Sequence, residues 1–267
     1  MPELAGRLIS TGLISLSIPV FFLCKTAPDS PQAPLPLKAA RPSVSSPATD
    51  TLNYVMGKFD PGSNERFAPV EQKYASREGM FLRKETLEAF VKMAKAAETD
   101  GVELKILSAT RNFTSQKSIW EDKWTGKRLV EDGQNLALTT PDPVKRALKI
   151  LEYSSMPGSS RHHWGTDMDL NALDNSFFAK GEGKKIYDWL VAHAGKYGFC
   201  QPYTAGRPHG YHEEKWHWSY MPLARPLTGF CERHLKNEMI SGFLGAETAK
   251  QINILQHYIL GINPDCR

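Results

Sequence analysis

The chain has 267 residues, a formal net charge of +4, 41% hydrophobic residues and 23% charged residues. This composition is ordinary for a globular protein, and the length allows one substantial domain together with export and linker segments. The basic residues are scattered rather than gathered in a dense run, which argues against nucleic acid as a partner.

The N-terminus has the pattern of an export signal. Arg7 is followed by the uncharged, apolar run Leu8–Leu23, which is shorter than the roughly 20 residues that a membrane-spanning helix needs. We therefore predict that residues 1–24 form a signal peptide and that the protein is exported to the periplasm or cell envelope. Cys24 ends the run and leaves a lipid anchor open as an alternative, although Leu23 is large for the residue before a lipidated cysteine.

A proline- and serine-rich segment follows the apolar run. Its six prolines are Pro28, Pro31, Pro34, Pro36, Pro42 and Pro47. Such a segment buries too little apolar surface to fold and behaves as an extended tether. We therefore assign residues 25–50 to a linker and residues 51–267 to one folded domain.

The domain is predicted to alternate between helices and short strands. A first helix ends at Asp100-Gly101, and its helical spacing is set by Leu87, Phe90, Val91 and Ala94. Alternation of apolar and charged residues then predicts a half-buried strand over 102–110. A second helix begins with Asp142 as N-cap and Pro143 at its first position. Its predicted buried residues are Val144, Ala147, Leu148 and Leu151.

Two more helices and three more strands complete the predicted domain. One helix stops at Gly198 and has on one face Ile186, Trp189 and Leu190. A helix near the C-terminus is predicted to bury Ile252, Leu255 and Ile259. Further short strands are predicted at 167–172, 199–203 and 215–220. The pattern predicts an α+β fold with a small central antiparallel sheet flanked by helices.

Three cysteines lie within this domain. In an oxidising compartment two of Cys200, Cys231 and Cys266 can pair, which leaves one over. Their spacing does not choose the pair.

Two groups of histidine and acidic residues lie on or beside the predicted strands. In the first group His162 ends a loop, Gly165 permits a sharp turn, and Asp169 projects from the strand that follows. In the second group Glu214 and His217 are three residues apart. Together the two groups can present two imidazoles and a carboxylate to one ion.

Three protein ligands with one position left for water are typical of a catalytic zinc site. Zinc lowers the pKa of that water to about 7 and polarises a carbonyl, while a carboxylate accepts the proton. The sequence therefore predicts Zn²⁺ as cofactor, His162, Asp169 and His217 as ligands, and Glu214 as base. The helix motif of the zincins is excluded, because His212 and His217 are five residues apart.

The two groups match the patterns S-x-H-x-x-G-x-A-x-D and E-x-W-H. They resemble the metallopeptidases grouped as lysostaphin, D-Ala-D-Ala peptidase and hedgehog-like, and above all the VanY-like D-alanyl-D-alanine carboxypeptidases of the vancomycin-resistance type. The resemblance covers roughly residues 75–225 and places the zinc site on the face of the sheet. It implies the same three ligands and the same base.

A third matching segment is Ser108–Gln116, in which the family's arginine is followed five residues later by glutamine. The resemblance implies that Arg111 faces the substrate, where a guanidinium suits a carboxylate or a developing oxyanion. It also implies that Gln116 and Ser160 hydrogen-bond the terminal residue of the peptide.

Asp167 departs from the family pattern, which has a small residue two positions before the ligand aspartate. Residues 167 and 169 share one face of a strand. Asp167 can therefore compete as a ligand, orient a ligand imidazole from behind, or be solvated. We favour the second interpretation, because ligand histidines usually need such a partner.

The resemblance implies a zinc carboxypeptidase that removes the C-terminal D-Ala of peptidoglycan stem peptides, and we expect it to act as a monomer. An L,D-carboxypeptidase or a wall endopeptidase of the same fold is an alternative. Segments 125–140 and 203–212 are expected to form the pocket walls that determine which bond is cleaved. A non-catalytic, zinc-containing module that binds the cell wall is an alternative of another class. Glu214 favours the enzyme, since a binding module has little need of a base.

Overall fold

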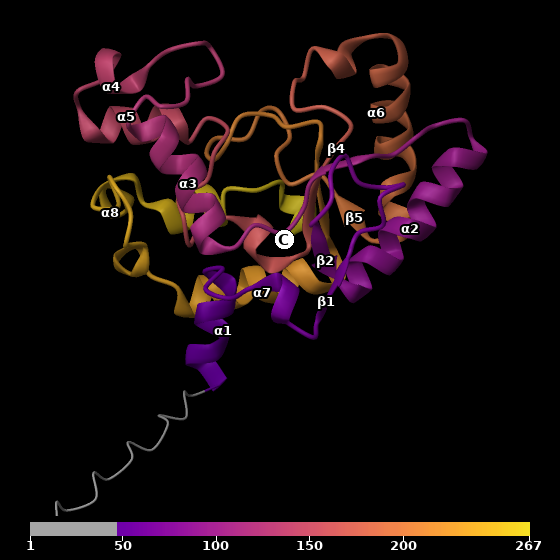
Figure 1. Cartoon of the computed structure of the whole chain (residues 1–267), viewed down its shortest axis with the longest axis horizontal. Coiled ribbons are helices and arrows are strands. Elements are labelled where there is room, and N and C mark those ends of the chain that lie inside the picture. The colour runs from indigo at the N-terminus through magenta and orange to yellow at the C-terminus, as the bar shows by residue number, and fades with distance from the viewer. Residues whose placement is uncertain (1–46) are drawn as a thin grey trace, which may run out of the picture. The chain divides into compact units, whose positions relative to one another are not determined.

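The computed structural model describes residues 47–267 (Figure 1). The predicted signal peptide, Cys24 and the linker up to residue 46 lie outside these described residues. Residues 47–50, which we assigned to the linker, form the first turn of helix α1 (Pro47–Val55). Within residues 47–267, no helix combines the length and the apolar character that crossing a membrane requires.

The described part of the chain alternates between helices and short strands, as the sequence predicts. After α1 the helices are α2 (Lys84–Thr99), α3 (Phe113–Trp124), α4 (Leu136–Thr139), α5 (Pro143–Ile150), α6 (Gly181–His193), α7 (Met221–His234) and α8 (Thr248–Ile252). The strands are β1 (Phe67–Pro69), β2 (Phe81–Arg83), β3 (Ile106–Ser108), β4 (Asp167–Leu170), β5 (Phe199–Cys200) and β6 (His217–Tyr220).

A four-stranded antiparallel sheet, in the order β3-β4-β6-β5, lies at the centre of these elements. Its apolar face contributes Met168, Leu170 and Trp218 to a core that α2 and α6 complete, and both helices lie beside the sheet in Figure 1. A second core gathers residues of α1, α3, α5, α7 and α8. The predicted α+β fold, with a small antiparallel sheet flanked by helices, is confirmed.

The predicted strand over 102–110 is shorter in the structure. Only Ile106–Ser108 pair with β4, through Ile106 with Leu170 and Ser108 with Asp169. Val102 and Leu104 remain buried, so the alternation correctly indicates which side chains point inward. The alternation does not indicate how far the neighbouring strand extends. Residues form a strand only where a neighbouring strand is present to accept and donate their backbone hydrogen bonds.

Two predictions about helices need correction. Helix α5 begins as predicted, with Asp142 accepting a hydrogen bond from the amide of Lys145 at 2.8 Å, but Leu148 is 43% exposed. The predicted C-terminal helix is two pieces, because α8 ends at Asn253 in the left-handed conformation (φ 55°) and a π-helical turn, Leu255–Ile259, follows.

A hairpin that the sequence analysis does not predict supports the loop of the first histidine group. Strands β1 and β2 pair antiparallel, with Phe67 opposite Arg83. Gly165 adopts φ 73°, and a Cβ atom there would lie 2.4 Å from Cε1 of Phe67. Only glycine fits this turn and this close contact together, so the hairpin and Gly165 jointly fix the path of the chain between His162 and β4.

The structure shows which two of the three cysteines form a disulfide, a choice that their spacing in the sequence does not determine. Cys200 of β5 forms a disulfide with Cys266, which lies 66 residues further along the chain. Cys231 is a buried free thiol in α7, and burial raises its pKa to about 12.

Candidate active site

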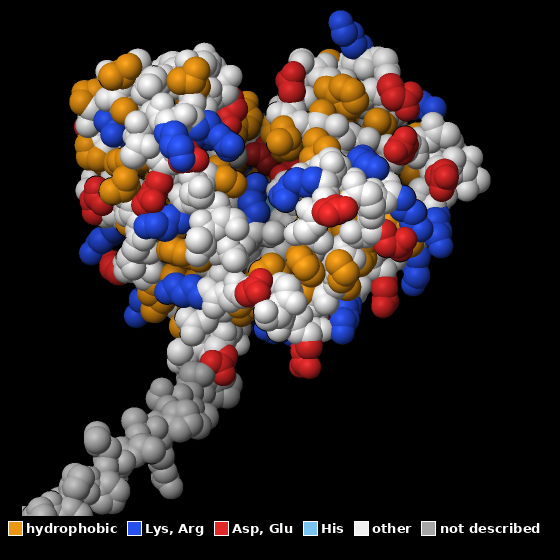
Figure 2. Space-filling view, in the orientation of Figure 1, with side chains coloured by type: hydrophobic (Ala, Val, Ile, Leu, Met, Phe, Trp, Pro, Cys, Tyr) orange, Lys and Arg blue, Asp and Glu red, His pale blue; other side chains and the backbone are white. Residues whose placement is uncertain are grey.

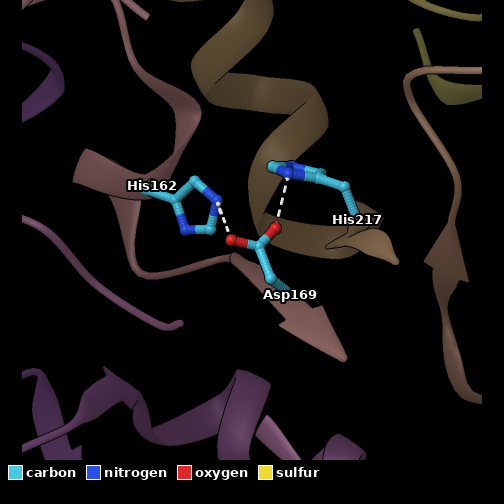
Figure 3. Close-up of side chains that lie close together, drawn as sticks. All are labelled: His162, Asp169 and His217. Atoms are coloured by element: carbon cyan, nitrogen blue, oxygen red, sulfur yellow. Dashed lines mark ion pairs between the residues drawn. The ribbon is translucent and has the colours of Figure 1, made fainter. Parts of the chain in front are cut away.

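The structure brings His162, Asp169 and His217 together on the sheet, with their potential ligand atoms within 4.8 Å of one another. Asp169 lies between the two imidazoles (Figure 3). Its Oδ2 is 3.3 Å from Nε2 of His162, and its Oδ1 is 3.1 Å from Nδ1 of His217. All three side chains are buried.

This cluster follows from the register of two strands. Asp169 of β4 is directly opposite His217 of β6, and Asp167 is opposite Ser219. Because alternate residues of a strand share a face, these four polar side chains lie on one face, opposite to the apolar face described above. His162 approaches the same face from the 3₁₀ turn Arg161–Trp164 that precedes Gly165.

Hydrogen bonds behind each imidazole fix which nitrogen faces the cluster. Nδ1 of His162 donates to the carbonyl of Ala109 at 2.9 Å, since a carbonyl can only accept. Nε2 of His217 lies 2.9 Å from Oδ2 of Asp167. The remaining nitrogens, Nε2 of His162 and Nδ1 of His217, therefore face Asp169 and are the ones that a metal ion would bind.

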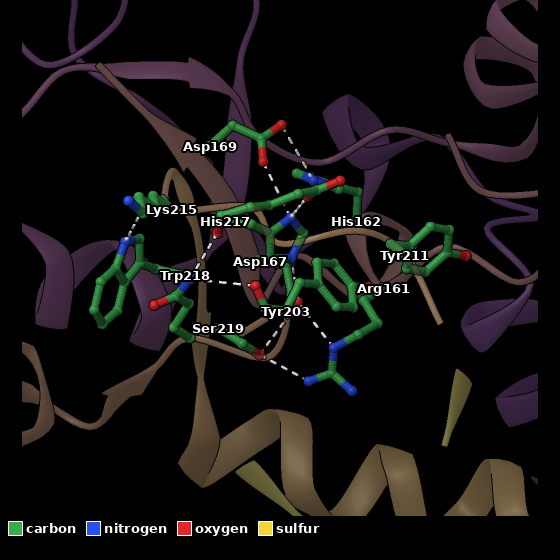
Figure 4. A network of polar contacts seen from close by, with 12 residues as sticks. Arg161, His162, Asp167, Asp169, Tyr203, Tyr211, Lys215, His217, Trp218 and Ser219 are labelled. Atoms are coloured by element: carbon green, nitrogen blue, oxygen red, sulfur yellow. Dashed lines mark hydrogen bonds and ion pairs between the residues drawn. The ribbon is translucent and has the colours of Figure 1, made fainter. Parts of the chain in front are cut away.

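Asp167 lies behind His217 rather than in the cluster or in solvent. It is fully buried, and its Oδ2 also accepts a bond from Nε of Arg161 at 3.0 Å. Its Oδ1 accepts from the hydroxyls of Thr166 and Ser219, at 2.6 Å and 2.8 Å. The structure thus gives Asp167 the second of the three placements considered above, and Figure 4 shows this network.

Arg161 completes the network and was not singled out in the sequence. Its guanidinium is 1% exposed and also donates to Ser219 at 2.8 Å and to Thr228 of α7 at 3.0 Å. A buried charge is costly unless it is paired and hydrogen-bonded, and here Arg161 and Asp167 satisfy each other. Nothing in the spacing of the sequence indicates this network, because Ser219 and Thr228 lie 58 and 67 residues further along the chain than Arg161.

The electrostatics of the cluster favour a bound cation. Burial, together with the charge of Arg111, lowers the pKa of His162. Burial opposes ionisation of Asp169, but the charge and hydrogen bond of His162 and the bond to His217 hold its pKa well below the usual range. Burial also opposes the charged form of His217, yet hydrogen bonds to three carboxylates raise its pKa well above the usual value. Surroundings that attract a proton to this nitrogen also attract a metal ion, and the two compete.

The geometry of the donor atoms fits zinc. In a tetrahedron with bonds of about 2.0–2.1 Å, neighbouring ligand atoms are about 3.3–3.4 Å apart. The observed separations are near this value but involve different oxygens, 3.3 Å from Oδ2 of Asp169 to His162 and 3.1 Å from Oδ1 to His217. With one ligand atom from each residue, all three atoms lie within 4.8 Å of one another. Oδ1 of Asp169 is buried, and apart from its contact with Nδ1 of His217 it has no hydrogen-bond partner within residues 47–267, a need that a metal ion would satisfy. His162, Asp169 and His217 can therefore hold zinc and leave one position open.

Glu214 reaches the same point from the segment that leads into β6. Its Oε2 lies 3.4 Å from Nδ1 of His217, and its amide is anchored to the carbonyl of Tyr203 at 2.9 Å. Burial raises the pKa of Glu214, with the hydrogen bond and charge of His217 acting in the opposite direction. A carboxylate with a raised pKa beside a metal position is suited to accept a proton.

A pocket of about 690 Å³ opens over this cluster. Figure 2 shows a hollow between the part that carries α3–α5 and the part that carries α6, with acidic side chains in its depth. Both segments expected to form walls reach the pocket, 125–140 through Arg128 and Glu131, and 203–212 through Tyr203 and Tyr211. Tyr203 packs on His217, with ring centroids 4.6 Å apart.

Arg111 lines this pocket. Its amide donates to the carbonyl of His162 at 3.1 Å, which places the two residues side by side. Its Nε is buried without a hydrogen-bond partner, and its guanidinium forms no ion pair with any residue in 47–267. The guanidinium is therefore available to an anion that enters the pocket.

Gln116 and Ser160 are buried and do not line this pocket, and their predicted hydrogen bonds to the peptide stay a prediction. Gln116 is 1% exposed, and its Nε2 donates to the carbonyl of Ser155 at 2.8 Å. Ser160 is fully buried at the start of the 3₁₀ turn that carries His162. Gln116 therefore supports Ser155, which does line the pocket. The packing of α3 and of the 3₁₀ turn covers the side chains of Gln116 and Ser160.

Comparisons with known proteins place this chain in a family. The family model described as VanY, D-alanyl-D-alanine carboxypeptidase, matches residues 79–223. The protein named "Putative carboxypeptidase YodJ" from Bacillus subtilis (strain 168) is 28% identical over 159 residues, which cover 57% of this chain and 49% of that protein. The chain spans about half the length of the curated relatives it matches.

Solved structures give further likenesses at low identity. The LdcB LD-carboxypeptidase is 24% identical, with 61% of this chain and 70% of that chain covered and a TM-score of 0.47. VanYB in complex with D-alanine-D-alanine is 23% identical, with 61% and 84% covered and a TM-score of 0.43. Because the VanY family model matches more than half of the sequence, this chain belongs to the VanY D-alanyl-D-alanine carboxypeptidase family.

Proposed function

We propose that this protein is a zinc-dependent D,D-carboxypeptidase that removes the C-terminal D-Ala of peptidoglycan stem peptides. The observation that carries the proposal is the buried cluster of His162, Asp169 and His217, with Glu214 directed at the same point. Membership of the VanY family supports the reaction class. The finer specificity, the zinc and the substrate are our inference.

Zinc, when bound, would polarise the scissile carbonyl and lower the pKa of water to about 7. Glu214 would accept the proton of the attacking water and later transfer it to the departing amine. Asp167 would hold the imidazole of His217 in one orientation while this happens. The walls formed by Tyr203 and Tyr211 would limit the access of bulk water.

Arg111 supplies the positive charge that a carboxypeptidase needs. A free C-terminal carboxylate or a developing oxyanion is best bound by a guanidinium with donors to spare. The unpartnered Nε of Arg111, beside His162, meets this requirement.

We further propose that the protein acts outside the cytoplasm, as a monomer in the periplasm or cell envelope. The disulfide between Cys200 and Cys266 supports an oxidising compartment, and the apolar N-terminal run supports export. Cys24 remains the position for a lipid anchor, if one is present.

The test is digestion of purified stem pentapeptide and tetrapeptide, with the products identified by mass. We expect the pentapeptide to lose one D-Ala, and a chelator to stop the reaction until zinc is restored. Cleavage of the tetrapeptide alone would indicate an L,D-carboxypeptidase, and equal cleavage of a C-terminal amide would indicate an endopeptidase. Binding to wall peptides without any cleavage would contradict the enzyme.

A further inference from the structure

The pocket that holds the metal cluster is also lined by a second group of charged side chains. Lys123 of α3 and the following residues Arg128 and Glu131 form this group. Tyr153 and Ser154 line the same pocket. The reaction described above uses none of these charges.

Lys123 is an unusual residue for such a wall. Its side chain is only 5% exposed, and lysine is almost never fully buried without a specific reason. The ammonium donates to Oγ of Ser154 at 2.8 Å and to Glu131. An ammonium has three N–H donors, and within residues 47–267 no third acceptor is found for this one. One donor is therefore left on a group that faces the pocket.

The charge around Lys123 is positive on balance. Glu131, whose side chain is 42% exposed, neutralises one of the two cations. The guanidinium of Arg128 is exposed on the same wall and has no ion-pair partner in the described part of the chain. A carboxylate that enters here meets two cations and one anion.

Segment 125–140 has anchors other than Lys123. This segment is already fixed by buried Val130, by the ion pair of Asp132 with Lys149 at 2.7 Å, and by the bond from Asn135 to the carbonyl of Gly126 at 3.1 Å. A methionine at position 123 would fill the same space without the cost of burying a charge. The ammonium thus calls for a reason other than packing.

We propose that Lys123, assisted by Arg128, forms a second anion-binding subsite, which binds a carboxylate carried by the substrate peptide upstream of the cleaved bond. The inference rests on the proposed function, in which Arg111 serves the C-terminal end. The substrate class is therefore a peptide with two carboxylates, one terminal and one on a preceding residue. Glu131 keeps the ammonium oriented when no substrate is bound.

The experiment uses peptides that end in D-Ala-D-Ala and carry one acidic residue one, two or three positions before that dipeptide, each with its amide counterpart. At one of these positions we expect the acid to have a kcat/KM on the order of 10-fold above that of the amide, mainly through KM, as a charge-assisted hydrogen bond predicts. Lys123→Met should bring that ratio close to one. Arg128→Gln, an exposed change that leaves the core intact, should reduce the ratio in part.

Two control variants separate recognition from structure. Glu131→Gln removes the competing anion and should keep or increase the ratio, whereas Lys149→Met loosens the same segment outside the pocket and should leave the ratio unchanged. A ratio near one at every position in the wild type, or a ratio that Lys123→Met does not alter, would overturn the subsite.

Failure of the proposed function gives a different result, because then the wild type cleaves none of the peptides. Calorimetric binding of the same peptides to the full-length Glu214→Gln variant measures the acid preference without turnover. Equal affinity for acid and amide in that measurement would also overturn the subsite.

Discussion

At the scale of single residues, Glu214 is expected to differ in role from the proposed metal ligands, because its carboxylate accepts a proton and does not bind the metal. Glu214→Gln keeps the size of the side chain but removes the proton acceptor. We expect this variant to fold and to hold about one zinc per chain, while activity falls on the order of 10²-fold or more. Metal analysis together with stem-peptide hydrolysis measures both quantities.

His217→Ala is the matched control for Glu214→Gln, since it removes a ligand and should lose zinc and activity together. Near-wild-type activity of Glu214→Gln would move the base elsewhere. In that case the buried carboxylate of Asp167 and the neighbouring Glu213 would be the next residues to substitute.

Arg111 can act on the bound substrate or on the transition state, and kinetics distinguish the two. If the guanidinium only anchors the terminal carboxylate, Arg111→Ala raises KM and leaves kcat nearly unchanged. We expect kcat to fall on the order of 10²-fold instead, because Arg111 lies beside His162, where an oxyanion would develop. Arg111→Lys, which keeps the charge but loses the planar fork, should be intermediate.

Asp167 is expected to act through His217 rather than on the substrate. Asp167→Asn keeps the shape but removes the charge that balances Arg161, so it should lower zinc affinity about 10- to 100-fold and also destabilise the fold. Competition with a calibrated chelator, at a temperature where circular dichroism shows the variant folded, measures the affinity. Unchanged zinc affinity would mean that Ala109 and the strand register alone orient the ligands.

At the scale of elements, the start of α5 depends on one side chain. Asp142 accepts the amide proton of Lys145, and Asp142→Ala should cost about 1 kcal/mol in the free energy of unfolding. Glu88→Ala, an exposed change within α2, is the control and should change that free energy by less than about 0.5 kcal/mol. Equal urea midpoints for the two variants would contradict a role for this cap.

The sheet is the element that makes the site possible, because its two faces are chemically different. Met168 and Trp218 turn to the core of α2 and α6, whereas Asp169 and His217 turn to the pocket. A shift of register by one residue would exchange these faces. Burial of the apolar face therefore also holds Asp169 and His217 opposite one another.

At the scale of the whole molecule, zinc should couple parts of the chain that are distant in sequence. The ligands come from the turn before β4, from β4 and from β6, so the complete site exists only in the folded protein. At free zinc about 1,000 times Kd the metal adds about 4 kcal/mol. For a domain of this size that corresponds to a Tm increase on the order of 10 °C.

Differential scanning calorimetry with zinc and with a chelator tests this coupling. Asp169→Asn is the control, and its Tm should respond to neither addition. An equal response of the wild type and of Asp169→Asn would place the stabilising metal at another site.

The sequence by itself determined the family resemblance, the residues of the candidate site and most of the helices. The spacing within Ser160–Leu170 and within Glu214–His217 predicted the cluster that the structure assembles, because those distances are local. Helical periodicity likewise located α2 and α6, since the pattern repeats within one element. The same periodicity misassigned Leu148, because it does not indicate how wide a face the neighbouring elements cover.

Only the tertiary structure decided what depends on contacts between distant segments. It placed Asp167 behind His217, covered Gln116 and Ser160, chose Cys200 and Cys266 as the pair, and turned Lys123 into the pocket. Each outcome depends on strand register or on packing between elements far apart in the chain. Spacing along the sequence specifies neither the strand register nor this packing. The free energy that fixes both comes from burying surfaces that meet only in the folded protein.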